Sequence, residues 1–432
     1  MTGRDHPLRG ALHGEVHARP AIALEAPERL SHIAMLSGED GAAADRTHLA
    51  RLCERFGISA PRDGSYFHHD FGPFRLKWER HTEFCSYTFL HRGSVAAPFD
   101  ETAIARVPAA WLAELPGRRM VAVHVAVEPA DGPRRPREET ARLIGSEMLV
   151  GGPMVGGAEA WTDFHIHGDG FSRILVRGGG PEAAETGRLV QRLLEIETYR
   201  MMALLAFPVA RDVGPEVARI ERTLAEVTDS ISGLGTVGDE RDTLMRLTRL
   251  AAEAERTVGV TRYRFSAAAA YHALVIERIG ELREARSEGL PTIGEFMERR
   301  LAPAMRTCES VAARQESLSQ RIARASDLLR TRIDVALQEQ NRALLGAMSL
   351  RARLQLRLQL LIEGLSVVAA TYYLAGLVGY LAKAVRAAGI PVPADIAVGV
   401  SVPVLAVLVW FVVHVARRRL FAAGRRDDDG CS

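Results

Sequence analysis

The sequence has few cysteines, few aromatic residues and almost no excess charge. Its four cysteines include no CxxC pair, so the spacing typical of zinc sites and dithiol redox motifs is missing from the 432 residues. Aromatic residues make up 6% of the chain, and the formal net charge is only +2. Because a DNA-binding protein normally carries a concentrated basic face, we expect no nucleic-acid partner.

The familiar phosphate-binding and hydrolase motifs are also missing. Glycines cluster in LVGGPMVGGAEA and VRGGGPEAAETGR, but neither stretch matches GxxxxGK followed by Ser or Thr, or places GxGxxG between a strand and a helix. The GxSxG turn of serine hydrolases is absent as well. The glycine clusters therefore predict flexible loops, and the sequence does not predict an enzyme.

The N-terminus lacks a long apolar segment. Its first residues, MTGRDHPLRGALHGEVHARP, contain no apolar core of a secretory signal peptide. We therefore expect the bulk of the chain to begin in the cytoplasm, where thiols stay reduced.

Two long apolar runs are present near the C-terminus, at 360–382 and 396–416. The first contains a single charged residue, Glu363, and the second contains none when its histidine is neutral. Each run is about as long as the roughly 20 apolar residues that cross a bilayer as a helix. Core helices of soluble proteins are usually shorter and carry a polar face. Two transmembrane helices are therefore the favoured interpretation, and a buried core hairpin is the alternative.

Basic residues flank the two runs unequally, and the positive-inside rule counts Lys and Arg near helix ends. The loop between the runs has only Lys383 and Arg386. Arginines precede the first run and follow the second: Arg351, Arg353, Arg357, Arg417, Arg418 and Arg419. Both termini are therefore expected in the cytoplasm. The arginines are expected at the lipid interface, either as a collar for anionic headgroups or as a simple stop-transfer flank.

The first run also carries small residues at regular spacing. Thr371, Ala375 and Gly379 recur every four residues, which permits close contact between helices in lipid. Packing against the second run is the favoured interpretation, and a self-assembly face is the alternative.

The middle of the chain predicts long helices. A helix over 182–207 is expected to end at Pro208, and a second tract is expected to begin near Pro215. GLGTVGDE and SEGLPTIGEF predict loops, and from about Pro303 a last helix runs without proline to 360. Its expected buried stripe is Leu329, Ile333, Leu337, Leu344 and Met348. Such coiled-coil-like stalk helices pair within a chain or between subunits, so we expect a homo-oligomer.

The residue pattern of the first 180 residues differs from that of the helical middle. SHIAML, SYFHHDF, FRLKWER, FCSYTFL, RMVAVHVAV, WTDFHIH and FSRILVR predict strands, and 45–56, 108–115 and 137–144 predict helices. Because the strands are often adjacent in sequence, an α+β domain with a mainly antiparallel sheet is expected. The predicted order is this cytoplasmic domain at 1–180, a helical stalk at 181–359, a two-helix transmembrane hairpin at 360–416 and a basic cytoplasmic tail at 417–432.

Two histidine groups are candidate metal ligands. They are His13, Glu15 and His17 in HPLRGALHGEVHARP, and Asp163, His165 and His167 in DFHIHGD. On strands, alternation places each trio on one face, where imidazole and carboxylate groups suit zinc or another divalent metal. The alternative is that they form the solvent-facing side of amphipathic strands or hydrogen-bond an N-terminal arm to the sheet.

Several long motifs resemble one family over nearly the whole chain. HPLRGALHGEVHARP, AWTDFHIHGDGFSRILV, GRLVQRLLEIETYRMMALLAFPVAR and RLQLRLQLLIEGLSVVAATYYLAGLVGYLAKA are similar to the uncharacterised membrane-anchored bacterial family DUF3422. The resemblance implies a bacterial inner (plasma) membrane location and agrees with the two-span tail. It implies no activity.

A looser similarity concerns layout alone. A cytoplasmic α/β domain, a long stalk helix and a C-terminal two-span hairpin resemble the CorA-type magnesium channels, which assemble as pentamers. Their Gly-Met-Asn signature is missing here, where the corresponding stretch reads AGLVGYLAKA. Lys383 and Arg386 in the outer loop would repel Mg²⁺, so the similarity implies a fold and an oligomer but not magnesium transport.

Three hypotheses for function follow, in order of preference. The first is a membrane-anchored, oligomeric sensing or scaffolding protein whose cytoplasmic domain binds a partner or small ligand. The second is a divergent CorA-like ion channel or transporter, and the third is a metal-dependent enzyme that uses the two histidine trios.

Overall fold

The computed structural model describes most of the chain in two compact units, Met1–Asp327 and Leu328–Ser432. Within them it describes residues 6, 8, 9, 13, 20–38, 41–61, 64–93, 97–132, 134–178, 182–231, 233, 236–387 and 393–428. Of these, the backbone alone is described at 155, 237, 394, 397 and 416–428.

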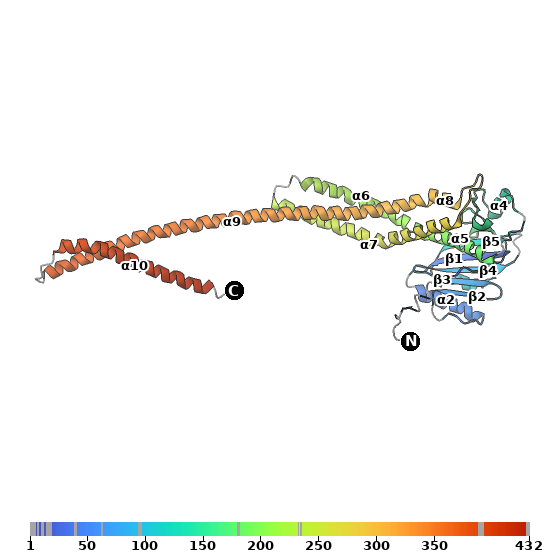
Figure 1. Ribbon diagram of the computed structural model, residues 1–432, viewed down its shortest axis with the longest axis horizontal. Helices are drawn as coiled ribbons and strands as arrows, with labels where there is room; N and C mark the ends of the chain where they lie inside the picture. Colours follow the sequence, from blue (N-terminus) through green and yellow to red (C-terminus); the bar gives the residue numbers. More distant parts are fainter. Residues whose placement is uncertain are drawn as a thin grey trace. The chain divides into compact units, whose positions relative to one another are not determined.

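The first unit is built on a sheet with the strand order β2-β3-β4-β1-β5-β8-β7-β6 (Figure 1). Its strands are β1 (Glu28–Leu36), β2 (Tyr66–Asp70), β3 (Arg75–Arg80), β4 (Phe84–Arg92), β5 (Arg118–Glu128), β6 (Val150–Pro153), β7 (Glu159–Thr162) and β8 (Ser172–Arg177). Every pairing is antiparallel except that of β5 with β8. The predicted α+β domain with a mainly antiparallel sheet is confirmed.

Helices cover both faces of this sheet, and α2 and α5 lie on opposite sides of it in Figure 1. On one face α2 (Ala42–Arg55) buries Leu49 and Leu52, close to the short helix α3 (Ala109–Ala113). On the other face α5 (Ala183–Leu204) buries Leu189, Leu193 and Ile196. The three helices predicted in this part of the chain are confirmed, and α4 occupies the predicted residues Arg137–Ile144. Among the described residues, this part of the chain also forms the 3₁₀ turns η2 (Ala103–Arg106) and η3 (Val155–Gly157).

Two local predictions were wrong because hydrogen bonds and close contacts of the backbone decided the structure there, and not the residue pattern. The glycines of LVGGPM form the edge strand β6 instead of a loop, since Gly151 has φ +122° and lies against the carbonyl of Ala160 on β7. The strand expected over 161–167 ends at Thr162. The Asp163 carboxylate then accepts the N–H of His165 at 3.1 Å, which turns the chain out of the sheet.

The helical region contains α6 (Ala206–Ile231), α7 (Val237–Leu282), α8 (Ile293–Arg300) and α9 (Ala302–Ala387). Pro208 does not end a helix. It lies in the first turn of α6, where a missing N–H costs little. Pro215 lies inside α6 and not near its start, so the predicted boundary was wrong there. The predicted long, proline-free last helix is confirmed as part of α9.

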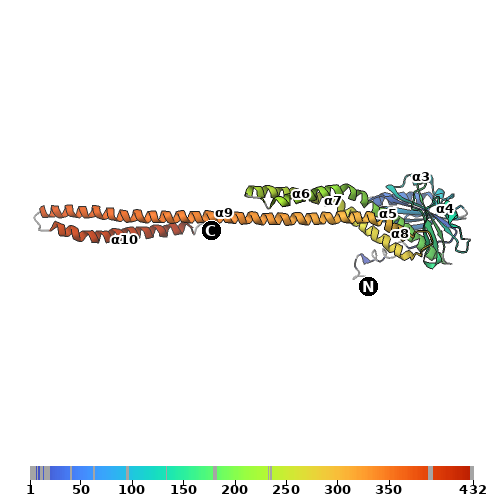
Figure 2. The ribbon, with the colours of Figure 1, turned by 90° about the horizontal axis from the view of Figure 1, so that it is seen from above.

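In the first unit, α6, α7 and the initial part of α9 lie side by side (Figures 1 and 2). Leu224, Leu247 and Leu318 are buried between them. A polar layer lies inside this apolar contact. Gln315 Nε2 donates to Thr257 Oγ1 at 3.1 Å, and Thr261 Oγ1 donates to Gln315 Oε1 at 3.1 Å. This layer joins α7 to α9 at one register.

The second unit contains the rest of α9 and α10 (Ala394–Asp428), which turns back along it (Figure 2). By length and composition, both helices are apolar enough to cross a membrane. A soluble core helix of that composition would be mostly buried. Here 11% of the apolar window of α9 and none of that of α10 are buried.

The stripe expected to be buried along α9 is only partly buried. Leu329 and Ile333 are buried, whereas Leu344 and Met348 are 62% and 65% exposed. The prediction was wrong for the latter pair because within this single chain no described element covers that part of the helix.

Candidate functional site

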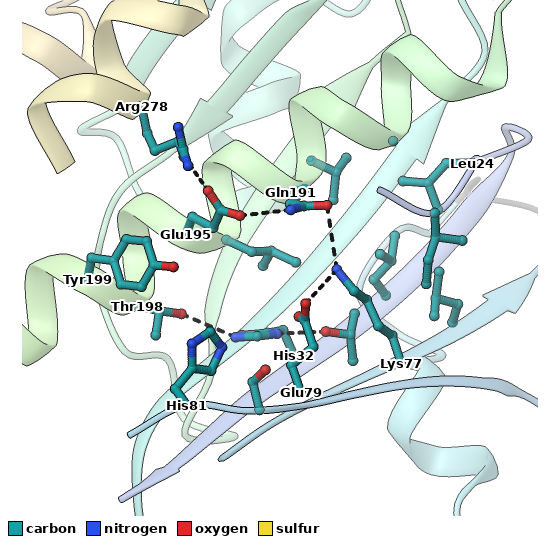
Figure 3. A pocket seen from close by; sticks show the side chains of 18 of the residues that line it. Leu24, His32, Lys77, Glu79, His81, Gln191, Glu195, Thr198, Tyr199 and Arg278 are labelled. Carbon is teal, nitrogen blue, oxygen red and sulfur yellow. Dashed lines mark hydrogen bonds and ion pairs between the residues drawn. The ribbon is translucent and has the colours of Figure 1, made fainter. Parts of the chain in front are cut away.

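A pocket of about 270 Å³ lies between the sheet and α5 in the first unit (Figure 3). The strands β1, β3 and β4 form its floor, and α5 forms its roof together with one side chain from α7. The polar groups that line it are His32, Lys77, Glu79, His81, Ser86, Thr88, Gln191, Glu195, Thr198, Tyr199 and Arg278. A pocket of this size suits a small molecule, since pockets for drug-sized ligands occupy roughly 300–1,000 Å³.

The strand register brings the polar floor together. His32 on β1 faces Thr88 on β4, and Thr88 faces Lys77 on β3, so the three side chains form one row across the sheet. One step along the strands, Glu79 faces Ser86. Because side chains alternate between faces, the apolar neighbours of Lys77 and Glu79 on β3 point into the opposite core.

His32 is held rigidly at the base of the pocket. Its Nδ1 lies 2.8 Å from Thr88 Oγ1 and its Nε2 lies 3.2 Å from Thr198 Oγ1. Burial, together with the nearby Lys77 ammonium, lowers the pKa of His32 to about 3. The ring is therefore neutral near pH 7 and serves as a hydrogen-bond bridge between the sheet and α5.

Lys77 is the buried cation of the pocket, with an exposed fraction of only 6%. Its Nζ lies 3.1 Å from Glu79 Oε1 and 3.5 Å from Gln191 Oε1 (Figure 3). An ammonium group has three N–H donors. The described residues offer it these two acceptors, so the third N–H is available to a bound molecule.

Ser86 adds a second available group. Its side chain is 2% exposed and lines the pocket, yet the described residues give its hydroxyl no hydrogen-bond partner. Buried hydroxyls are normally hydrogen-bonded, because leaving one unpaired costs free energy. A ligand or a water molecule in the pocket would satisfy it.

The roof connects the pocket to α7. Glu195 accepts from Gln191 Nε2 at 2.8 Å and from Arg278 Nε (Figure 3). Arg278 also donates to Glu281 at 3.1 Å. A further ion pair joins Arg192 to Glu281 at 2.7 Å. Ion pairs therefore connect α5, which lies above the pocket, to α7, which packs along α9.

The apolar end of the pocket is formed partly by residues just before β1. Leu24 and Ile22 line it, and the Leu24 N–H donates to the carbonyl of Ala183 at the start of α5. A Cβ on Gly187 would lie 1.9 Å from the Ile22 carbonyl oxygen. Only glycine permits this close approach of the segment to α5.

The predicted metal ligands are only partly within the described residues. His13 is exposed, and Glu15 and His17 lie outside the described residues. In the β7–β8 loop, Asp163 Oδ2 lies 3.2 Å from His167 Nε2 and 3.7 Å from His165 Nδ1. The His165 ring also faces the Asp163 carbonyl at 2.8 Å. No group of three His, Cys, Asp or Glu side chains in the described part of the chain is placed to hold a metal ion.

One further constellation resembles a catalytic triad in composition. Ser31 Oγ lies 2.9 Å from His124 Nδ1, and His124 Nε2 lies 3.9 Å from Asp169 Oδ2. Ser31 is fully buried and its Oγ accepts the N–H of Ile104. Burial lowers the pKa of His124 to about 4. With no substrate access to Ser31, the arrangement is a buried hydrogen-bond network.

The residues predicted at the membrane interface and helix contact lie in the second unit. Arg351, Arg353 and Arg357 are exposed on α9, and α10 includes 417–419, whose side chains are outside the described set. Thr371 and Ala375 are buried. A Cβ on Gly379 would lie 3.1 Å from Val398 Cγ2 of α10.

The sequence reasoning missed the pocket, although a signal was present. In FRLKWER, which predicted a strand, the charged residues Lys77 and Glu79 alternate with apolar ones. The helix that covers this face carries Gln191, Glu195 and Thr198 at helical spacing. Two polar faces on neighbouring elements are the pattern that could have indicated a polar cavity.

Comparison with known proteins identifies a family. A search of curated proteins and a search of solved structures found no significant match to the chain. A family model described as "Protein of unknown function (DUF3422)" matches residues 4–420. Since this match covers nearly the whole chain, the protein belongs to the DUF3422 family.

Proposed function

We propose that this protein is a membrane-anchored sensor whose first unit binds a small molecule in the pocket between the sheet and α5. The proposal rests on two polar groups in the pocket that have no hydrogen-bond acceptor or donor among the described residues. They are the third N–H of Lys77 and the hydroxyl of Ser86. Buried groups of this kind are retained at a cost in stability unless a bound molecule satisfies them. Catalytic motifs were missing from the sequence, so binding is favoured over turnover.

The anchoring half of the proposal rests on the two C-terminal apolar helices. In this proposal 360–382 and 396–416 cross the bacterial inner membrane, and both termini face the cytoplasm. The surplus of arginine before the first span and after the second supports that orientation. Arg351, Arg353 and Arg357 would then lie near anionic headgroups, each contributing about 1 kcal/mol.

The stalk is proposed to assemble with other copies of the chain. Its support is the exposed apolar surface of α9 ahead of the first span, which includes Leu344, Leu345, Met348, Leu350 and Leu354. Stable proteins normally bury an apolar surface of this extent. The simplest way to bury it is to pack α9 against the same helix of another copy of the chain.

The small-molecule site is tested on the full chain purified in mild detergent. Native mass spectrometry is expected to detect a bound small molecule on the wild type. Val190→Trp fills the pocket and is expected to abolish the bound mass. The matched control, Val260→Trp, alters a side chain of α7 that is 71% exposed and is expected to retain it. Equal loading of both variants would refute the assignment of the ligand to this pocket.

Anchoring and assembly are tested separately. Fractionation is expected to place the chain with membranes, and a reporter fused after Ser432 is expected on the cytoplasmic side. The mass of the detergent-purified protein gives the oligomeric state. A monomer or dimer would remove the CorA-like channel considered from the sequence, and liposome flux tests transport directly. Elemental analysis tests the metal-dependent alternative.

A further inference from the structure

We propose that the pocket accepts an α-amino acid with an aliphatic side chain. This inference rests on the proposed function and adds the ligand's chemical class. It is drawn from the charge balance of the lining, the pairing of Lys77 with Glu79, and the separation of the pocket into a polar and an apolar end.

The charge balance favours a ligand without net charge. The lining contains two permanent cations, Lys77 and Arg278, and two carboxylates, Glu79 and Glu195. Each cation is already paired with one of these carboxylates, and the buried His32 is neutral. A ligand with a net charge would bring an uncompensated charge into a mostly buried site, which is costly. A zwitterion brings none.

The Lys77–Glu79 pair is complementary to an α-ammonium and α-carboxylate. In the pair, Nζ and Oε1 are 3.1 Å apart and share one face of β3. The two charged groups of an amino acid are attached to one carbon, so they can face this pair with the signs reversed. The carboxylate would accept the third N–H of Lys77, and the ammonium would donate to Glu79. The hydroxyl of Ser86, directly across from Glu79, would donate to the same carboxylate.

The other end of the pocket takes a short apolar group. It is lined by Leu24, Leu30, Leu90, Val190 and Leu194. All five belong to the core or its edge and offer no polar group from their side chains. A volume of about 270 Å³ leaves room for a small ligand.

The test measures binding to the full chain in mild detergent by titration calorimetry, with L-leucine as the probe. Two analogues each lack one charge: 4-methylpentanoate has no ammonium, and 3-methylbutylamine has no carboxylate. Leucine is expected to bind, and each analogue is expected to bind at least about 10-fold more weakly, since each loses a charge-assisted hydrogen bond. Ser86→Ala is expected to weaken leucine about 3- to 10-fold, and Glu79→Gln more than about 10-fold. Glu221→Gln, which removes an ion pair with Arg314 outside the pocket, is the matched control.

The outcomes separate this inference from the proposed function. If 4-methylpentanoate binds as tightly as leucine, or if Glu79→Gln leaves leucine binding unchanged, the ligand is not recognised as a zwitterion. If none of the three probes binds, the aliphatic amino-acid class is wrong. In either case the native mass measurement with Val190→Trp still decides whether the pocket holds a small molecule.

Discussion

Replacing His32 with glutamine should flatten the acid dependence of stability. In the folded protein the pKa of His32 is about 3, whereas an unfolded chain returns it to 6.5. Between these values the unfolded state binds a proton that the folded state does not. Stability linked to His32 is therefore complete above pH 6.5 and is lost as the pH falls towards 3.

The size of the effect follows from the pKa difference. One pKa unit corresponds to about 1.4 kcal/mol, so lowering the pH to 5 spans about 1.5 units below 6.5 and costs about 2 kcal/mol. His32→Gln removes this cost, and the amide can still reach Thr88 and Thr198. Other titrating groups, including His124, are present in both proteins, so their contributions cancel in the comparison.

The assay is urea unfolding of the full chain in mild detergent, followed by tryptophan fluorescence at pH 7.5 and pH 5.0. The wild type should lose about 2 kcal/mol more than His32→Gln between these conditions. Equal losses would refute the inference that His32 is buried in its neutral form. A larger loss for the variant would refute it as well.

Three further changes test the pocket and the C-terminal hairpin. Lys77→Met should destabilise the chain by roughly 2–4 kcal/mol because it leaves the Glu79 carboxylate without its cation, and Lys77→Met with Glu79→Gln should recover at least about 1 kcal/mol in the same unfolding assay. Gly187→Ala should cost about 1–3 kcal/mol because its Cβ would meet the carbonyl of residue 22, although alanine normally favours a helix. Gly379→Leu should lower the thermal midpoint in detergent because the contact between α9 and α10 is already tight.

Matched glycines provide the controls. Gly259 in α7 and Gly376 in α9 have no heavy atom within 4 Å of an added Cβ. Gly259→Ala should be neutral or stabilising, and Gly376→Leu should leave the hairpin unchanged. If Gly187→Ala or Gly379→Leu behaves like its control, the corresponding close contact does not exist. If the losses in unfolding free energy caused by Lys77→Met and Glu79→Gln add up in the double variant, the two side chains are not coupled.

Much of the fold could be predicted because its signals are periodic and local. The alternation in FRLKWER and the long proline-free tract after Pro303 each specify an element without knowledge of its neighbours. The loop at Asp163 could not be found this way. There a single side chain captures a backbone N–H and ends a strand that the alternation would have continued.

Boundaries set by proline and glycine were harder to predict. Pro208 was expected to stop a helix, but the break falls between Leu204 and Ala206, which places the proline in a tolerated first-turn position. Gly151 was expected in a loop because it lies in a glycine cluster. Its pairing with β7 depends on a later segment of the chain and cannot be seen in the local sequence. Both outcomes are decided by tertiary contacts.

The pocket could not be predicted because it depends on register between distant segments. His32 and Thr198 are 166 residues apart in sequence and meet only because α5 crosses the sheet at one position. The residue types were visible in the sequence, but their shared location was not. The metal hypothesis, in contrast, started from histidines that are close in sequence, which were expected to share one face of a strand.

The Thr257–Gln315–Thr261 layer limits how α9 can move against α7. A lengthwise displacement by one helical turn, about 5.4 Å, would move the Gln315 amide away from at least one of its two threonine partners inside an apolar contact. Leaving such a group unsatisfied costs about 1–3 kcal/mol. A conformational change that passes from the pocket along α7 and α9 would therefore tilt or rotate these helices more easily than slide one along the other.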